Sequence, residues 1–399
     1  MRFKTKTIGE VAEVQTGPFG SQLHKEDYVE AGTPIVTVEH LGQRRFSMQN
    51  LPRVKDCDRD RLLKYTLKTG DLVFSRVGSV DRISFVTDDE NGWMFSGRCL
   101  RLRVFGEIDA LWLYYFFCLE QTKQFVRNIA VGATMPSINT KLLSEVPVSY
   151  PENIADQRKI ASILSLIDDK IELNSTINHN LLQQVLALYR QMFVDSPNDN
   201  RKICRADEYF DISIGKTPPR KEPEWFKTVR TDNIVWVSIA DMGNCGLFID
   251  DSSEYLSPDA VKKFNVVTVP NDTVLLSFKL TVGRIAITDG QMTTNEAIAH
   301  FKTDNKAINE YLYCYLKSYN FQTLGSTSSI ATAVNSKIIK AMPFVVPTDE
   351  EISTFHDFAA PIFNKIKACQ HENARLVELR DSLLPKLMSG EIDVSEVEL

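Results

Sequence analysis

The sequence predicts an α+β protein in which two similar globular domains are joined by two long antiparallel coiled-coil helices, as a pseudo-two-fold internal repeat. Three observations predict this fold: a repeated motif, two long heptad patterns, and two blocks of short β-like runs that precede the helices. A body with two similar halves can meet a partner that also has two-fold geometry. Duplex DNA is such a partner.

The repeat is clearest where each block passes into its helix. Residues 139–151 read Asn-Thr-Lys-Leu-Leu-Ser-Glu-Val-Pro-Val-Ser-Tyr-Pro, and residues 335–347 read Asn-Ser-Lys-Ile-Ile-Lys-Ala-Met-Pro-Phe-Val-Val-Pro. The asparagine, the lysine and both prolines recur 196 positions later. A chain of 399 residues is long enough for two or more domains. We therefore divide it into globular domains at 1–150 and 197–346 and helical segments at 151–196 and 347–399, the last with an acidic tail.

Each globular block contains short runs of β-branched and aromatic residues separated by glycine-containing turns, a pattern typical of strands. In the first block we expect strands at 34–38, 71–74, 82–86 and 99–104, and then a helix at 109–128. In the second block the same order gives strands at 234–239, 273–278, 284–288 and 297–301, and a helix at 307–324. Gly17 and Gly215 each follow an early strand of their block.

Both helical segments carry an apolar heptad, and the two heptads align when 195 is added to the residue number. A seam with a period of 3.5 residues requires a long partner of the same kind, so we expect the helices to pair with each other. The alternative is that each packs on its own domain. About forty helical residues span roughly 60 Å, which suits a spacer between two sites on a partner. The predicted seam residues are Ile160, Leu164, Ile167, Ile171, Asn174, Asn178, Leu181, Ile362, Ile366, Asn373, Leu376 and Leu383.

Polar residues and prolines interrupt these heptads. Asn174, Asn178 and Asn373 lie at seam positions, where a paired asparagine can fix the register of two helices. The alternative is that they are exposed where the helices splay apart. Pro361 and Pro385 each remove a backbone donor, so we expect the second helix to be kinked or split there.

The charge of the chain is unevenly distributed. The net charge of −6 argues against a protein that simply coats nucleic acid. However, residues 1–150 carry a net +2 and residues 197–346 a net zero, whereas residues 151–196 carry −2 and residues 347–399 carry −6. The acidic excess therefore lies in the helices and the tail, and both globular blocks can present basic faces.

Several features point to a cytoplasmic protein. The first residues contain no apolar stretch of the signal-peptide type, and the seven cysteines are scattered without a Cys-x-x-Cys pair, so we expect reduced thiols. The longest apolar run, 111–119, is too short to span a membrane. We interpret it as a buried helix and expect no membrane contact.

The sequence contains no persuasive catalytic or metal-binding pattern. It lacks the Asp-Pro-Pro-Tyr or Asn-Pro-Pro-Phe run that holds a flipped adenine, a glycine-rich cofactor loop and a Gly-x-Ser-x-Gly elbow. Gly215-Lys216-Thr217 resembles the end of a phosphate-binding loop, but Phe210 stands where that loop needs its first glycine. The six histidines have no metal-ligand spacing. We therefore expect a binding protein with no catalytic residue, no metal and no cofactor of its own.

Polar and basic loops in both blocks favour DNA recognition. Arginine and glutamine can contact guanine and adenine edges in a bidentate manner, whereas lysine and serine mostly bind phosphates. For each residue alone, the alternative is that it is ordinary solvated surface. The polar loop 326–329 belongs to the same set of candidate loops. The candidate DNA-binding residues are Ser21, Gln22, Lys25, Arg44, Arg45, Arg76, Ser79, Arg98, Asn139 and Lys141 in the first half, and Lys216, Thr217, Arg220, Lys221, Lys279, Thr281, Arg284, Asn295, Asn335 and Lys337 in the second half.

Residues in both helical segments resemble a known family. Val146-Pro147-Val148-Ser149-Tyr150-Pro151, Asp156-Gln157-Arg158-Lys159-Ile160 and Ile167-Asp168-Asp169-Lys170-Ile171-Glu172-Leu173-Asn174 are similar to the first conserved region of specificity subunits of type I restriction–modification systems. Leu383-Leu384-Pro385-Lys386-Leu387-Met388-Ser389-Gly390-Glu391-Ile392 is similar to their second. The resemblance covers the whole chain in order. One departure is Glu350-Glu351-Ile352, which stands where Gln157-Arg158 would be expected.

The resemblance implies a function and a set of partners. Each globular domain would be a target-recognition domain that reads one half of a split, asymmetric site in double-stranded DNA, and the helices would set the gap between the half-sites. Two methyltransferase subunits would dock on this chain and methylate adenine at N6, and restriction subunits would add translocation and cleavage. S-adenosylmethionine, ATP and Mg would belong to those partners. Because Arg44-Arg45 has no clear twin in the second block, the half-sites should differ.

Two other functions are compatible with parts of the sequence. A two-lobed protein scaffold would bind proteins through both blocks and would contact no specific DNA sequence. A stand-alone DNA enzyme would show nuclease or methyltransferase activity as the purified chain, which the missing motifs disfavour.

Overall fold

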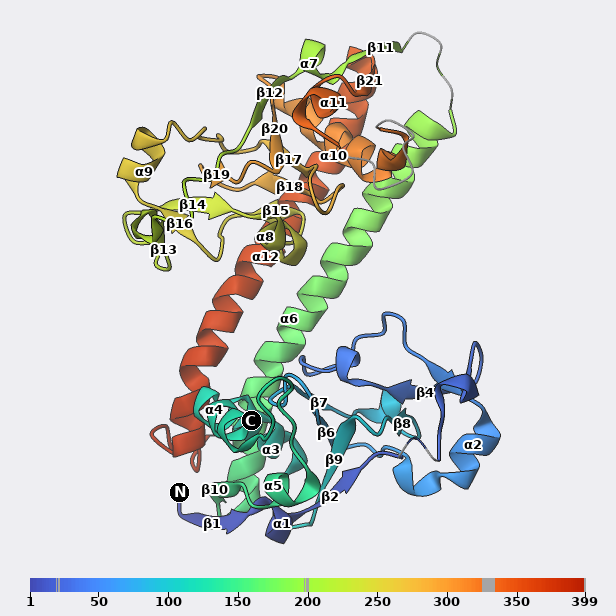
Figure 1. Ribbon diagram of the computed structural model, residues 1–399, viewed down its shortest axis with the longest axis vertical. Coiled ribbons are helices and arrows are strands. Elements are labelled where there is room, and N and C mark those ends of the chain that lie inside the picture. Colours follow the sequence, from blue (N-terminus) through green and yellow to red (C-terminus); the bar gives the residue numbers. More distant parts are fainter. Residues whose placement is uncertain (19, 21, 197, 199–200, 325–333, 398–399) are drawn as a thin grey trace. The chain divides into compact units, whose positions relative to one another are not determined.

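The computed structural model describes residues 1–18, 20, 22–196, 198, 201–324 and 334–397, and it divides into two compact units. The first unit comprises Met1–Lys170 and Leu376–Leu399, and the second comprises Ile171–Arg375. Each unit contains one globular domain together with stretches of both long helices (Figure 1). The chain therefore leaves the first unit, builds the second and returns to the first.

The first domain is built from three sheets, with the strand orders β2-β9-β6-β7, β3-β5-β4-β8 and β1-β10. All pairs are antiparallel except β4 with β8, which is parallel. The bounds are β1 Phe3–Thr7, β2 Ala12–Thr16, β3 Tyr28–Val29, β4 Thr33–Val36, β5 Arg53–Val54, β6 Leu72–Ser75, β7 Ile83–Phe85, β8 Met94–Phe95, β9 Cys99–Val104 and β10 Pro147–Pro151. The short helices are α1 Ile8–Val11, α2 Asp56–Arg61, α3 Ala110–Cys118, α4 Glu120–Ile129 and α5 Thr140–Ser144.

The second domain repeats this topology with one added strand. Its sheets have the orders β12-β20-β17-β18-β15, β13-β16-β14-β19 and β11-β21, and β14 with β19 is again a parallel pair. The bounds are β11 Lys202–Arg205, β12 Asp211–Ile214, β13 Phe226–Lys227, β14 Ile234–Val237, β15 Phe248–Ile249, β16 Tyr255–Leu256, β17 Val274–Ser277, β18 Ile285–Thr288, β19 Thr293–Thr294, β20 Ile298–Lys302 and β21 Pro343–Val346. The short helices are α7 Ala206–Tyr209, α8 Ile239–Asn244, α9 Pro258–Lys263, α10 Asn309–Ser318 and α11 Ser336–Lys340.

The helical patches of the two domains are shorter than expected. The helix predicted at 109–128 is two helices, α3 and α4, which meet at Leu119 in an extended conformation. The α3 helix is buried around most of its surface, as its apolar sequence predicted, whereas α4 presents a polar face. The change of direction at Leu119 lets that polar face reach water. In the second domain, the helix predicted at 307–324 is α10 flanked by two 3-10 turns.

The two longest helices are α6, Ile154–Tyr189, and α12, Asp349–Ser389. The α12 helix is continuous through Pro361 and Pro385, so of the expected kink or split, the split does not occur. Both prolines are exposed, and buried residues anchor the helix on either side of each: Ala359 and Phe363 around Pro361, and Leu384 and Leu387 around Pro385. Packing of one face is enough to keep the helical path where single hydrogen bonds are lost. Among the described residues, no helix combines the length and apolarity needed to cross a membrane.

Both long helices contribute to the core of each unit. In the first unit, Ile160 and Leu164 of α6 join Leu387 of α12 and the inner face of the first domain. In the second unit, Val185 of α6 and Phe355 of α12 join the inner face of the second domain in the same way. In each unit, positions later along the first helical segment meet positions earlier along the second: Lys159 meets Val394 and Asp168 meets Arg380 in the first unit, and Asn174 meets Asn373 and Arg201, just beyond α6, meets Glu351 in the second. The two helices therefore run antiparallel, as the heptad pattern predicted.

Gly17 and Gly215 occupy equivalent points of close backbone approach. A Cβ atom at Gly17 would overlap the carbonyl oxygen of Ser96, just after β8. A Cβ atom at Gly215 would overlap the backbone and side-chain oxygens of Thr294, at the end of β19. Because it has no side chain, Gly17 lets the chain pass from β2 directly over the end of the parallel pair β4–β8. Gly215 does the same between β12 and the parallel pair β14–β19.

We predict that Gly17→Ala and Gly215→Ala each lower the free energy of unfolding of their unit by about 1–3 kcal/mol, because the added methyl group overlaps backbone atoms that cannot move independently. Thermal and urea unfolding of the purified chain would measure the change. Gly106→Ala is the matched control, since a Cβ atom there meets no atom within 4 Å. Equal stability of all three variants would contradict the assigned close approach.

Candidate nucleic-acid interface

Two equivalent loops join the central strands of the domains, Ser75–Arg82 after β6 and Ser277–Arg284 after β17. Each loop is closed by the same backbone hydrogen bond: Ser75 N donates to Arg82 O at 3.0 Å, and Ser277 N donates to Arg284 O at 2.9 Å. The serine hydroxyls also donate inward, to Val77 O at 2.8 Å and to Thr281 O at 2.6 Å. Both loops therefore have the same length and the same base, and their residue numbers differ by 202.

The arginine that ends each loop has a structural role. Arg284 donates from Nη1 to the carbonyl oxygen of Ile239 at 2.5 Å, and its guanidinium lies against Gly243. Arg82 likewise donates to the carbonyl oxygen of Leu41 and lies against Gly42. Each guanidinium therefore secures the turn that follows the strand β4 or β14.

In the second domain, three segments meet at what we name the second loop edge: Gly215–Thr217, Ser277–Arg284 and Thr294–Glu296. Lys216 N donates to Thr294 O at 2.9 Å, and the Thr217 hydroxyl donates to the Glu296 carboxylate. Burial raises the pKa of Glu296, but the Thr217 hydrogen bond and the charges of Lys279 and Arg220 outweigh it and hold the pKa below its ordinary value. The edge therefore keeps one ionised carboxylate among its cations.

In the first domain, the equivalent segments form the first loop edge: Gly17–Pro18, Ser75–Arg82 and Ser96–Arg98. Arg76 N donates to Arg98 O at 2.9 Å, and Arg76 Nη1 donates to Gly97 O at 3.1 Å. Gly78 N donates to Pro136 O at 2.8 Å, which brings the loop after α4 to this edge. Ser79 and Arg98 are exposed there, and Arg76 is half-buried.

The helix pair of the second unit contains an asparagine ladder. Asn174 is 1% exposed, and its Nδ2 donates to Asn373 Oδ1 at 2.9 Å and to Glu372 Oε2 at 2.9 Å. Asn373 Nδ2 donates in turn to the carbonyl oxygen of Ile171 and to Ser175 Oγ, both at 3.2 Å. Any slip of one helix against the other would leave these buried amides unpaired, so the ladder fixes the register. Asn178 is half-buried, and its Oδ1 atom has no hydrogen-bond partner.

Ion pairs fix the first domain to the helices of the first unit. Asp168 of α6 accepts hydrogen bonds from Tyr115 Oη at 2.7 Å and from Arg380 Nη1 of α12 at 2.9 Å. Arg44 donates to the carboxylate of the next residue, Asp169, and to the carbonyl oxygen of Ser165 at 3.4 Å. These contacts join a domain loop, α3, α6 and α12 in one polar cluster.

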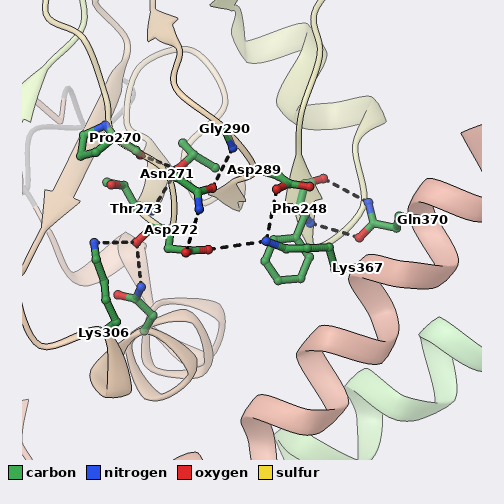
Figure 2. A network of polar contacts seen from close by, with 12 residues as sticks. Phe248, Pro270, Asn271, Asp272, Thr273, Asp289, Gly290, Lys306, Lys367 and Gln370 are labelled. Atoms are coloured by element: carbon green, nitrogen blue, oxygen red, sulfur yellow. Dashed lines mark hydrogen bonds and ion pairs between the residues drawn. The ribbon is translucent and has the colours of Figure 1, made fainter.

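A different network fixes the second domain to α12 (Figure 2). Lys367 lies 3.2 Å from an oxygen of Asp289 and 3.5 Å from one of Asp272, above the ring of Phe248. Gln370 donates to Phe248 O at 3.1 Å and accepts from Phe248 N at 3.2 Å, so it extends the strand edge as a backbone amide would. The second domain is therefore held on α12 by Lys367 and Gln370.

The two halves of the chain match one family model. The model is described as the type I restriction modification DNA specificity domain, and it matches residues 2–183 and again residues 198–377. This chain belongs to the type I restriction–modification DNA specificity family. Each match covers one globular domain and most of the long helix that follows it.

Named relatives agree with this assignment. The chain is 24% identical to the type I restriction enzyme HindI specificity subunit of Haemophilus influenzae, over 82% of this chain and 88% of that protein. It is 26% identical to the MjaIX specificity subunit of Methanocaldococcus jannaschii, over 72% and 70%. A solved S subunit of a type I restriction–modification system from M. genitalium shares 16% identity and a TM-score of 0.58 over 97% of this chain and 96% of that chain, which shows a common fold.

The structure separates the candidate DNA-binding residues of this specificity-family chain into two groups. Some are exposed at the protein surface, and others, exposed or not, have side chains committed to hydrogen bonds with neighbouring groups of the protein. The exposed residues are Ser79, Arg98 and Lys141 in the first domain and Lys216, Lys221, Lys279, Thr281 and Lys337 in the second. Ser21 and the loop 326–329 lie outside the described residues, and Lys25 begins a 3-10 turn.

The committed residues pair with neighbouring groups. Arg220 forms a bidentate ion pair with Glu254 at 2.7 and 2.8 Å and stacks on Phe226, and Arg284 holds the turn after β14. Asn295 uses its Oδ1 to accept from Ala297 N at 3.0 Å. In the first domain, Arg44 is tied to α6, Arg45 donates to Thr87 Oγ1 at 2.6 Å, and Gln22 accepts from Tyr65 Oη at 2.8 Å.

The repeated asparagines Asn139 and Asn335 are helix caps. Asn139 Oδ1 accepts from Leu142 N at 2.9 Å, and Asn335 Oδ1 accepts from Lys337 N at 3.0 Å and Ile338 N at 3.1 Å. An N-cap asparagine satisfies backbone donors at a helix start. The repeated asparagines are therefore explained by the start of α5 and α11, and Lys141 and Lys337 are exposed in the first turn of these helices.

Several important residues were not among the sequence candidates. Asp168, Arg380 and Lys367 anchor the domains on the helices, but each looks like one more charge on a polar helix face. Arg82 could have been found, because it lies 202 positions before Arg284 and follows a loop of equal length. The sequence departure at Ile352 can be described from the contacts of its equivalent in the first unit, Gln157. Gln157 is fully buried, accepts from Asp109 N at 2.7 Å and donates to Pro151 O at 2.8 Å, whereas the second unit buries the apolar Ile352 at this position.

We predict that Lys279→Ala and Arg76→Ala weaken binding of target duplex by the assembled complex. Lys279→Ala should weaken specific and non-specific duplexes alike and reduce the slope of log affinity against log salt by about 1, because lysine mainly neutralises phosphate. Filter binding or fluorescence anisotropy across a salt series would measure both quantities.

Arg284→Ala is the contrasting variant in this series. It should lower the thermal stability of the chain, since it removes the donor that holds Ile239 O, whereas Lys279→Ala should leave stability unchanged. Unchanged affinity in both Lys279→Ala and Arg76→Ala would remove this pair of loops from the DNA interface.

Proposed function

We propose that this chain is the DNA-reading subunit of a type I restriction–modification complex, in which each globular domain reads one half of a bipartite, asymmetric target in double-stranded DNA. One observation carries the proposal: the chain holds two copies of the specificity domain whose equivalent strands have the same order, but with different side chains at the two loop edges. Equal scaffolds with unequal edges suit two half-sites of different sequence.

The long helices would act as a spacer between the half-sites and as docking sites for partners. Two adenine-N6 methyltransferase subunits would bind to this chain, and restriction and translocase subunits would join them, so that the complex works on DNA in the cytoplasm. S-adenosylmethionine, ATP and Mg would be bound by those partners. The chain itself would be non-catalytic, which its lack of an adenine methyltransferase motif supports.

The methylation step assigned to the partners requires this chain to hold DNA that is distorted. Methylation of a base requires that the base leave the duplex stack. A subunit that holds the DNA during this step has to tolerate a distorted duplex, so contacts to the backbone and to bases beside the flipped adenine are expected from the loop edges.

The test is to co-express this chain with the methyltransferase encoded beside it and to map N6-methyladenine across the host genome. We expect one bipartite motif with a fixed gap, and we expect it to disappear when this chain is deleted. If the methyltransferase is active and bound to this chain but no such motif exists, the chain is a two-lobed protein scaffold that does not read DNA. Methylation or cleavage by the purified chain alone would overturn the non-catalytic assignment.

We further predict that lengthening the helix pair changes only the gap. Four residues inserted near Asn178 in α6 and four near Asn373 in α12 add about 6 Å of helix, roughly two base pairs of DNA. Methylome mapping should then show the same two half-sites with a wider gap. An insertion into α6 alone is the control, because it breaks the register of the Asn174–Asn373 ladder and should impair assembly. An unaltered motif in the double insertion would rule out the spacer.

A further inference from the structure

Leu280 is the most exposed large apolar side chain of the described residues. It lies at the tip of the Ser277–Arg284 loop with 99% of its surface in water, and its backbone has φ +59°, in the left-handed region. Exposure forfeits the favourable burial of a leucine side chain, and a branched residue with positive φ is strained. The same residue therefore carries two separate costs, and strain of this kind is concentrated at functional positions.

The first domain shows that the loop does not need a leucine there. Gly78 stands at the equivalent position, three residues after Ser75, and has φ +76°. Glycine adopts this conformation without strain. Because the two loops share their length, the backbone hydrogen bond from serine to arginine that closes them and their final arginine, a loop of this length closes with glycine at this position. The leucine side chain is therefore an addition to the fold of the second domain.

Leu280 is also prevented from turning inward. Ser277 Oγ donates to Thr281 O at 2.6 Å and accepts from Arg284 N at 3.0 Å, and Gly283 N donates to Ser277 O at 3.0 Å. These three bonds hold both ends of the tip. The side chain therefore projects from a preorganised turn, which lowers the entropy cost of any contact that it makes.

The surroundings of Leu280 favour DNA as the contact. Lys279 and Thr281 flank it and are both exposed, and Lys216 is exposed on the same loop edge. A protein-binding hot spot normally lies in a well-packed, desolvated pocket. A single exposed apolar side chain flanked by lysines, with the Glu296 carboxylate beside them, instead suits a groove with phosphates on its rims and apolar surfaces between the bases. Leucine is one of the residues that enter grooves and contact or separate bases.

We infer that Leu280 inserts into a groove of the second half-site and makes an apolar contact with its bases; this inference rests on the proposed function. The first half-site receives no equivalent contact, because Gly78 has no side chain. Leu280 is thus a specificity-determining residue of one half-site only, and it contributes to the asymmetry of the target.

The experiment uses the full chain in complex with its methyltransferase partner, on duplexes that carry the motif found by methylome mapping. Leu280→Gly should retain or raise the unfolding temperature, because it relieves the strain, and should weaken binding of the full target about tenfold or more. The loss should vanish on a duplex whose second half-site is scrambled. Leu63→Ala, at a leucine of the first domain that is 61% exposed, is the control beside Leu280→Ala and should bind as the parent does.

The outcomes separate this inference from the proposed function. If the parent complex shows no preference for a bipartite motif, the proposed function fails. If the parent complex selects its motif and Leu280→Gly and Leu280→Ala bind it equally well, the inference about Leu280 is wrong while the function stands. If the variants instead lose the methyltransferase subunit in size-exclusion chromatography, Leu280 contacts a protein partner, and the DNA contact is likewise wrong.

Discussion

The packing of each globular domain against both long helices is the constraint on which the rest of the structure depends. In the first unit, Ile160 and Leu164 of α6 and Leu387 of α12 belong to the same buried cluster as the inner face of the sheet. Burial of such surfaces is the main favourable term in folding. Since Leu376–Leu399 belongs to the unit that begins at Met1, the core of the first domain is complete only when the end of the chain has joined it. The ion pair between the Met1 amino group and Asp393 lies at this junction.

The internal repeat separates what builds a domain from what varies between domains. The close approach at Gly17 and Gly215, the caps Asn139 and Asn335, and the arginine that closes each loop occur in both halves with the same contacts. The residues between them differ: when 202 is added to the residue number, Gly78 corresponds to Leu280 and Val77 corresponds to Lys279. Because the shared contacts close both loops at their base, the unmatched side chains between them can serve recognition.

The sequence allowed the helices and the repeat to be predicted, but not the role of most individual side chains. The heptad predicted the antiparallel pair because its period depends on local sequence alone. The strand at 99–104 was predicted with its observed bounds because β9 is flanked by clear turns. In contrast, the sequence predicts Arg284 as a DNA contact, and it does not reveal that the guanidinium donates to Ile239 O, a group 45 residues away in sequence. Spacing and composition do not reveal contacts of that range.

The same limitation applies to the asparagines and prolines of the helices. Asn174 could have been exposed or paired, and only the approach of Asn373 across the helix pair decides between these. Pro361 was expected to disrupt α12 from its local chemistry, but the buried residues around it keep the helix continuous. In both cases a tertiary contact outweighs a local preference.

The committed arginines also bear on how much of the DNA charge this chain can neutralise. Arg44, Arg220 and Arg284 are engaged with Asp169, Glu254 and Ile239 O, so their guanidinium groups are not available without breaking internal contacts. The exposed cations that remain near the second loop edge are lysines, which position phosphates more than they distinguish bases. Affinity that depends on counterion release requires many such contacts. We therefore expect the partner subunits to supply much of the phosphate neutralisation, while polar, glycine and leucine positions at the loop tips provide this chain's share of base discrimination.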